Sequence, residues 1–180
     1  MTLKEKANLM SDNELAKAIT RIAHEVLEKN KDRDLVAIVG IKYRGMFLAE
    51  RIAAEMKRIA KRDFPVGAMD ITLYRDDLTQ VAEQPVVHAT EIEFDVSGRI
   101  VVLVDDVLFT GRTVRCALDE LIDFGRPKMI QLAVLIDRGH REFPIRPDYV
   151  GKSVPTSLTE VVEVRMKESD GKDEVVLCQK

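Results

Sequence analysis

The spacing of apolar residues predicts three amphipathic helices, over residues 11–30, 46–61 and 112–124. The first opens with Ser11 and Glu14, which form the S-x-x-E pattern of a capping box. Its apolar stripe comprises Leu15, Ile19, Ile22, Val26 and Leu27. The third is followed by Gly125 and Pro127, which are typical of a helix end.

Unbroken apolar runs predict strands between these helices, at residues 35–39, 66–73, 100–104 and 129–136. Two further runs, 160–166 and 174–177, predict a hairpin that turns at Asp170-Gly171. The long, polar stretch 74–98 is rich in acids and predicts a flexible flap. Strands that alternate with helices predict an α/β fold with a mostly parallel central sheet and helices on both faces.

Length and composition are those of one soluble domain over residues 1–180, with 46% hydrophobic and 33% charged residues. No apolar run approaches a membrane span and the first residues lack an apolar signal core, so we expect a cytoplasmic protein. Cys116 and Cys178 lie far apart without metal-ligand spacing. The net charge of −3 excludes a protein that coats nucleic acid indiscriminately, but it allows a local basic patch.

The most specific segment runs from Ile100 to Thr113 and reads IVVLVDDVLFTGRT. Two acids, Asp105 and Asp106, follow the buried run, and a short T-G-x-T loop then leads into a helix. Backbone N–H groups of such a loop bind a phosphate dianion, while carboxylates accept hydrogen bonds from ribose hydroxyls. The alternative is a generic strand whose acids cap the next helix, but one cap needs only one acceptor. The pattern therefore favours a sugar-phosphate site.

Two other loops follow apolar strands, at residues 40–45 and 137–141. Because ligands of such sheets sit beyond the carboxyl ends of the strands, the three loops are expected to converge on one rim. Lys42 and Arg44 in the first loop offer charge to an anionic leaving group. Taken alone they are two solvated bases, and it is their place on the shared rim that favours the functional interpretation.

The Ile100–Thr113 segment resembles the phosphoribosyl pyrophosphate (PRPP) signature of type I phosphoribosyltransferases. With D-R-G-H-R-E-x-P-I-R from Asp137, D-I-T-L-Y-R-D-D-L from Asp70 and T-R-I-A-H from Thr20, the chain resembles bacterial pyrimidine operon regulators that are also uracil phosphoribosyltransferases. The match extends from the first helix to Val164. It implies the type I phosphoribosyltransferase fold, with a flexible flap and a small hood.

The resemblance implies that uracil and PRPP give UMP and pyrophosphate, with Mg²⁺ carried mainly by PRPP and no direct metal ligands. Asp105 and Asp106 would hold the ribose hydroxyls, and Arg138 would lie near the base. The PRPP- and nucleotide-binding residues so implied are Ile41, Lys42, Tyr43, Arg44, Arg75, Asp105, Asp106, Val107, Leu108, Phe109, Thr110, Gly111, Arg112 and Thr113.

A basic stretch and one helix face point to a second partner. From Arg138 to Lys152 there are four fixed positive charges against two acids, which taken alone indicates a solvated loop. The resemblance implies binding of the messenger RNA leader of a pyrimidine operon, under control of UMP or UTP, by a dimer or higher homo-oligomer. The RNA-binding residues it implies are Thr20, His24, Arg141, Arg146 and Lys152.

Three positions depart from that family's pattern: Tyr43 replaces Thr, Phe109 replaces Tyr, and Ser153 replaces Asn. Purine-using relatives often place an acid where Phe109 stands. Because Phe transfers no proton, uracil is favoured over a purine. Two alternatives stay open, a nucleotide-sensing RNA-binding regulator with negligible catalysis and a purine-salvage phosphoribosyltransferase. The complete pyrophosphate loop favours retained catalysis.

Overall fold

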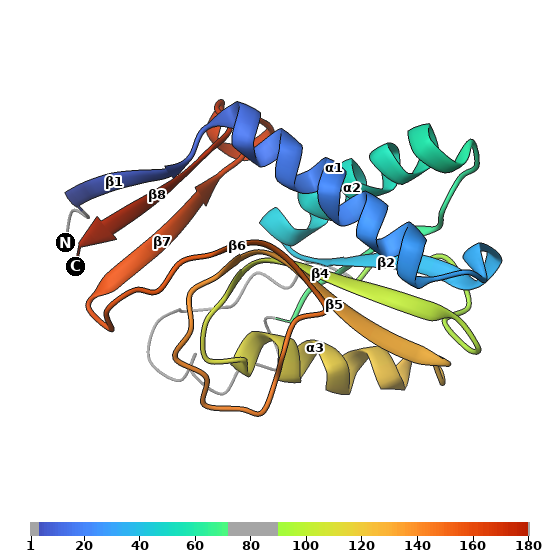
Figure 1. Ribbon diagram of the computed structural model, residues 1–180. Coiled ribbons are helices and arrows are strands. Elements are labelled where there is room, and N and C mark those ends of the chain that lie inside the picture. Colours follow the sequence, from blue (N-terminus) through green and yellow to red (C-terminus); the bar gives the residue numbers. More distant parts are fainter. Residues whose placement is uncertain (1–3, 72–89, 180) are drawn as a thin grey trace.

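A computed structural model describes residues 4–71 and 90–179, and it contains two sheets (Figure 1). Its elements are β1 (Lys4–Met10), α1 (Asp12–Lys29), the 3-10 turn η1 (Arg33–Leu35), β2 (Val36–Ile41), α2 (Arg44–Ala60), β3 (Val66–Met69), β4 (Ile100–Leu108), α3 (Arg112–Asp123), β5 (Met129–Asp137), β6 (Tyr149–Ser153), β7 (Glu160–Arg165), α4 (Lys167–Asp170) and β8 (Glu174–Gln179). The larger sheet is parallel, in the order β3-β2-β4-β5-β6. The smaller is antiparallel, in the order β1-β8-β7.

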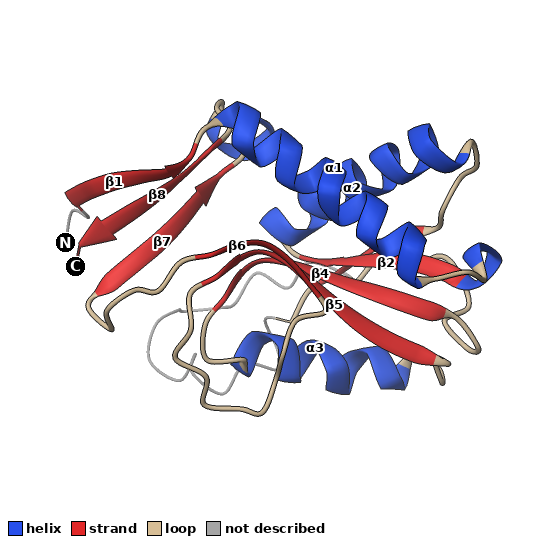
Figure 2. Ribbon diagram, viewed as in Figure 1, coloured by secondary structure: helices blue, strands red, loops and turns tan. Residues whose placement is uncertain are grey.

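The parallel sheet lies between helices, with α1 and α2 on one face and α3 on the other (Figures 1 and 2). Successive side chains of β4 point to opposite faces, as the two-residue strand period requires. Ile100 and Val102 belong to the apolar cluster under α1 and α2. Val101 and Leu103 belong to the cluster on the α3 side. An uninterrupted apolar run is therefore needed to fill both layers.

The three predicted helices are confirmed, and the first carries the predicted capping box. The N–H of Ser11 donates to the Glu14 carboxylate at 2.8 Å, and the N–H of Glu14 donates to Ser11 Oγ at 3.4 Å. No helix among the described residues is long and apolar enough to cross a membrane. The C-terminal hairpin is also confirmed, but its tight turn was wrong, because the four-residue helix α4 joins the strands.

Other boundaries differ from the predictions. Strands β1 and β6 were not predicted, since their charged and short sequences gain strand structure only from pairing with β8 and β5. The expected loop 40–45 was too long, because β2 reaches Ile41 and α2 begins at Arg44. The two acids lie inside β4 rather than after it, because pairing with β5 continues to Leu108.

The flap prediction covered residues 74–98, of which 74–89 lie outside the described residues. For residues 90–98 the prediction of an arm separate from the core was wrong. Val96 is fully buried, Ile92 and Phe94 pack against the apolar cluster, and Glu91 exchanges backbone hydrogen bonds with Ala68 at 2.7 and 2.9 Å. This segment is a fixed border of the parallel sheet.

Candidate active site

Two adjoining cavities lie at the carboxyl ends of β2 and β4. One, of about 280 Å³, is lined by Asp105 and the residues from Val107 to Val114. The other, of about 310 Å³, is lined by Ile41, Lys42, Tyr43, Arg44, Asp70, Ile71, Asp105, Asp106, Val107 and Thr113. Because they share Asp105, Val107 and Thr113, they form one continuous site. The loops at residues 40–45 and 105–113 thus converge on one site, as predicted.

The T-G-x-T loop is shaped to turn β4 into α3. Gly111 has φ +92°, a left-handed conformation that favours glycine, and a Cβ there would lie 3.2 Å from the Ile145 side chain. The Thr110 carbonyl accepts the N–H groups of Glu142 and Phe143 at 2.9 and 3.2 Å. The 137–145 loop therefore anchors this loop, while the start of α3 lines the cavity.

The two acids are held by their own backbone. The N–H of Asp106 donates to Asp105 Oδ1, and the N–H of Val107 donates to Asp106 Oδ1, both at 2.9 Å. Burial raises the pKa of Asp106, and although its hydrogen bond with Asp105 and the positive charge of Arg44 lower that pKa, they do not offset the burial. A half-buried carboxylate on a rigid strand suits a ligand that supplies hydroxyl donors.

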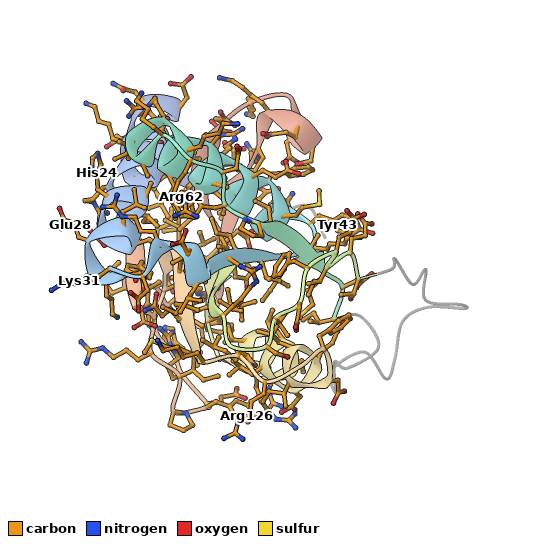
Figure 3. The ribbon with its side chains drawn as sticks, turned by 90° about the vertical axis from the view of Figure 1, so that its right-hand side faces the viewer. His24, Glu28, Lys31, Tyr43, Arg62 and Arg126 are labelled. Atoms are coloured by element: carbon orange, nitrogen blue, oxygen red, sulfur yellow. The ribbon has the colours of Figure 1, made fainter. Side chains whose placement is uncertain are left out.

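The loop between β2 and α2 consists of Lys42 and Tyr43, which are joined by a cis peptide bond. The Lys42 N–H donates to the Met69 carbonyl at 2.8 Å, so β3 fixes the loop backbone. The Lys42 ammonium is 2.8 Å from the Glu91 carboxylate, and its side chain is only 8% exposed. Tyr43 is 53% exposed and points outward (Figure 3).

Glycines bring this loop close to the acids. A Cβ on Gly40 would lie 2.4 Å from the Gly45 carbonyl oxygen, and one on Gly45 would lie 2.5 Å from the Val104 carbonyl oxygen. The start of α2 therefore rests directly on the backbones of β2 and β4. This contact sets Arg44 beside Asp106, whose charged form the guanidinium favours.

Arg138 is buried at the end of β5 and is held by the segment that follows β6. Its Nε donates to Thr156 Oγ1 at 3.0 Å. Its Nη2 donates to the carbonyl oxygens of Ser157 and Glu160 at 3.0 and 2.8 Å. The guanidinium carbon lies 4.0 Å from the centroid of the Phe109 ring, a cation–π contact. Burial lowers the pKa of Arg138. Arg138 thus joins the phosphate loop to the segment that leads into β7 of the small antiparallel sheet.

The five residues predicted to bind RNA are spread over α1, the β5–β6 loop and β6. His24 and Arg146 are exposed, and His24 lies on the opposite side of the molecule from Tyr43 (Figure 3). Lys152 is exposed and donates to the Leu9 carbonyl at 2.7 Å. Thr20 is half-buried and donates to Glu55 at 3.3 Å.

Arg141 makes several hydrogen bonds and an ion pair within the protein. Its guanidinium donates to the carbonyl oxygens of Phe109, Gly139 and Ile145 at 2.8, 3.2 and 3.1 Å. It also pairs with Asp137 at 2.6 Å. These contacts hold the 137–145 loop against the phosphate loop. No hydrogen bond or ion pair within the described part of the chain joins any two of the five predicted RNA-binding residues.

Several site residues were missed from sequence. Asp70 and Ile71 line the second cavity, and Glu91 pairs with Lys42. The D-I-T-L-Y motif gave a signal for the first two, whereas no local pattern marks Glu91. The predicted Arg75 lies outside the described residues.

Comparison with known proteins identifies the family. The phosphoribosyl transferase domain family matches residues 7–169. Bifunctional protein PyrR of Pelotomaculum thermopropionicum is 60% identical over 176 residues, covering 98% of this chain and 97% of the relative. Bifunctional protein PyrR of Thermus aquaticus is 56% identical over 178 residues, covering 99% and 98%.

Solved structures agree at the level of the fold. The hypoxanthine phosphoribosyltransferase of Trypanosoma cruzi has a TM-score of 0.74 at 16% identity, with 97% of each chain covered. A hypoxanthine-guanine phosphoribosyltransferase of Bacillus anthracis has a TM-score of 0.70 at 17% identity, with 100% of each chain covered. With the sequence match and the site geometry, these results show that the chain belongs to the phosphoribosyl transferase domain family and, within it, to the bifunctional PyrR proteins.

Proposed function

We propose that this protein transfers a phosphoribosyl group from PRPP to uracil, and that it also binds messenger RNA to regulate a pyrimidine operon in response to uridine nucleotides. The catalytic activity is supported by one continuous site, in which Asp105 and Asp106 lie between two loops. One is the T-G-x-T loop, here called the phosphate loop, and the other is the basic loop that contains Lys42 and ends at Arg44, the first residue of α2. This order of groups matches the order of parts in PRPP, from 5′-phosphate through ribose to pyrophosphate.

Each part of the site has a separate task in this proposal. The N–H groups of the T-G-x-T loop and the start of α3 bind the 5′-phosphate. Asp105 and Asp106 accept hydrogen bonds from the ribose hydroxyls, and their negative charge stabilises the positive charge that develops on the ribose as pyrophosphate departs. Lys42 and Arg44, with Arg75, offset the charge of the departing pyrophosphate.

Mg²⁺ fits this site as an ion carried by the substrate. Among the described residues there is no group of three or more His, Cys, Asp or Glu side chains that could hold a metal ion. Mg²⁺ characteristically binds one or two carboxylates together with substrate phosphates. Asp70, Asp105 and Asp106 line the cavity at the β2–α2 loop, and one or two of these carboxylates would bind an ion held mainly by PRPP, where it would neutralise phosphate charge.

Uracil is the proposed acceptor because Phe109, which cannot transfer a proton, stands where purine-using relatives often place an acid. Phe109 directly precedes the phosphate loop, and its ring contacts the Arg138 guanidinium. The same ring meets the His140 ring edge-on, with centroids 5.8 Å apart. The test is one assay of uracil, hypoxanthine, xanthine and orotate with PRPP and Mg²⁺. Uracil should have the highest kcat/KM, and a higher value for hypoxanthine would refute the proposal.

RNA binding is the second proposed function, and the exposed His24, Arg146 and Lys152 support it. Their place away from the cavity would allow RNA and nucleotide to bind at the same time, with coupling through the 137–152 segment. The test is a filter-binding titration of pyrimidine-operon leader RNA with and without UMP. UMP should tighten the binding of leader RNA. Equal binding of a scrambled RNA would refute the RNA-binding function and leave the catalytic function alone.

A further inference from the structure

An ion pair joins the basic loop to the distant C-terminal hairpin. The Nη2 of Arg44 lies 3.2 Å from Oδ1 of Asp170, which is the last residue of α4 and 126 positions away in the chain. The Nε of Arg44 is buried without a hydrogen-bond partner in the described part of the chain. The charge of Arg44 also favours the ionised forms of both Asp106 and Asp170. Arg44 is therefore set between one carboxylate in the active site and another in the hairpin.

Asp170 is itself fixed by its own turn. Its Oδ2 accepts the backbone N–H of Met166 at 2.9 Å and the hydroxyl of Ser169 at 2.6 Å. Gly171 follows with φ +73°, a left-handed conformation that ends the short helix. Because the turn uses Oδ2, the other oxygen is left to receive Arg44. Asp170 therefore presents a fixed acceptor to the long side chain of Arg44.

Docking of the hairpin onto α2 does not depend on this pair. Arg51, seven residues further along α2, bonds both oxygens of Glu168 at 2.9 and 2.6 Å. It also bonds both oxygens of Asp173 at 3.0 and 2.8 Å. A single exposed ion pair such as Arg44–Asp170 adds little stability. Its consequence is instead the orientation of Arg44.

We infer that Asp170 is a positioning residue for pyrophosphate binding, which it serves by holding the Arg44 guanidinium at the cavity mouth. This inference rests on the proposed role of Arg44. The Nε–H of Arg44 is buried, but the two η nitrogens carry four N–H donors, and Asp170 uses one on Nη2, so donors remain for phosphate oxygens. Without Asp170, the guanidinium loses this partner and must be ordered when substrate binds, which weakens binding about three- to tenfold.

The opposite effect is expected if Asp170 merely competes for Arg44. Removal of a negative charge beside the guanidinium would then strengthen its attraction for pyrophosphate and lower KM. The two roles therefore differ in sign. Asp170→Asn distinguishes them, because the amide oxygen of Asn can still accept from Met166 and Ser169 while its NH₂ cannot accept from Arg44.

The experiment compares D170N with the matched control E168Q, which removes the same charge from α4 and weakens a pair with Arg51 instead. D170N should raise the KM for PRPP, and for pyrophosphate in the reverse reaction, by about three- to tenfold. The KM for uracil and the kcat should change by less than about twofold. E168Q should leave all four constants within about twofold. A fall in the KM for PRPP in D170N, or an equal rise in E168Q, would overturn the inference.

R44M separates this inference from the proposed function. An unchanged KM for PRPP in R44M would refute the role of Arg44 and the inference with it. A raised KM in R44M with an unchanged KM in D170N would refute the inference alone. If D170N does not fold, S169A replaces it, since it removes one hydrogen bond to Asp170 but keeps the charge. S169A should raise the KM for PRPP by a smaller factor, and no rise would overturn the inference.

Discussion

Replacement of Asp106 by Asn is expected to make the protein more stable while it removes most of its activity. The pKa of Asp106 is raised in the folded protein because burial disfavours its charged form. Its contribution to stability is therefore complete at pH values below its ordinary pKa of about 3.9 and is lost as the pH rises through the raised pKa. At neutral pH the folded protein carries the cost of a charged carboxylate that is partly withdrawn from water.

The structure bounds the size of this effect. The amide introduced by Asp106→Asn would keep an oxygen for the Val107 N–H, and its NH₂ could donate to the Asp105 carboxylate, so no hydrogen bond of the acid pair need be lost. Asp106→Asn removes the cost of withdrawing the Asp106 charge from water, but it also removes the attraction between that charge and Arg44. We expect a net gain of about 1 kcal/mol in the free energy of unfolding, or about 2–4 °C in Tm for a chain of this length.

The assay is thermal unfolding of the wild type and D106N at several pH values between about 4 and 8, beside turnover of uracil with PRPP. The difference in Tm should grow with pH and then level off above the raised pKa, while turnover falls about 10²–10³-fold. D119N is the control, because Asp119 is exposed on α3 and pairs with Arg115 across one turn. If D106N is less stable than the wild type at pH 7.5, burial of that charge has been misjudged.

Three further outcomes are expected. R138M should lower the free energy of unfolding by about 1–3 kcal/mol in urea titration, because the carbonyls of Ser157 and Glu160 lose their donor, whereas unchanged stability would contradict these contacts. G40A should lower turnover and stability together, because its methyl group would meet the Gly45 carbonyl at 2.4 Å, and wild-type kinetics would show that this contact is not tight. R146A should weaken leader-RNA binding and reduce its salt dependence while uracil turnover stays within about twofold, and loss of both activities would show that the two surfaces are not separable.

The parts of the site that were predictable from sequence are those in which chemistry and fold coincide locally. The run from Ile100 to Val104 could fill both faces of a parallel sheet, and the acids and the T-G-x-T loop came next in the same fourteen residues. The helix boundaries followed from equally local signals, such as the Ser11–Glu14 capping box. These features depend on residues within one or two turns of each other.

The parts that were not predictable depend on pairing between distant segments. Strand β1 has a mostly exposed, charged sequence, and it is a strand because β8 pairs with it. β4 continues through Asp105 and Asp106 because β5 offers partners as far as Asp137. The sequence of residues 90–98 is polar enough to predict a free arm, yet three apolar side chains within it are enough to attach it to the core.

The same argument explains why the C-terminal hairpin contributes to the site although its sequence showed only a turn. Asp170 was predictable as a turn residue, and it does serve the turn with one oxygen. The other oxygen meets Arg44 because α4 lies along α2, where Arg51 attaches it through two separate ion pairs, with Glu168 and with Asp173. For a residue such as Asp170, the sequence therefore predicts the role in the local turn but not the contact with a residue far away in the chain. Pyrophosphate binding at this site is therefore best tested by substitution of Asp170 in the hairpin as well as of Arg44 itself.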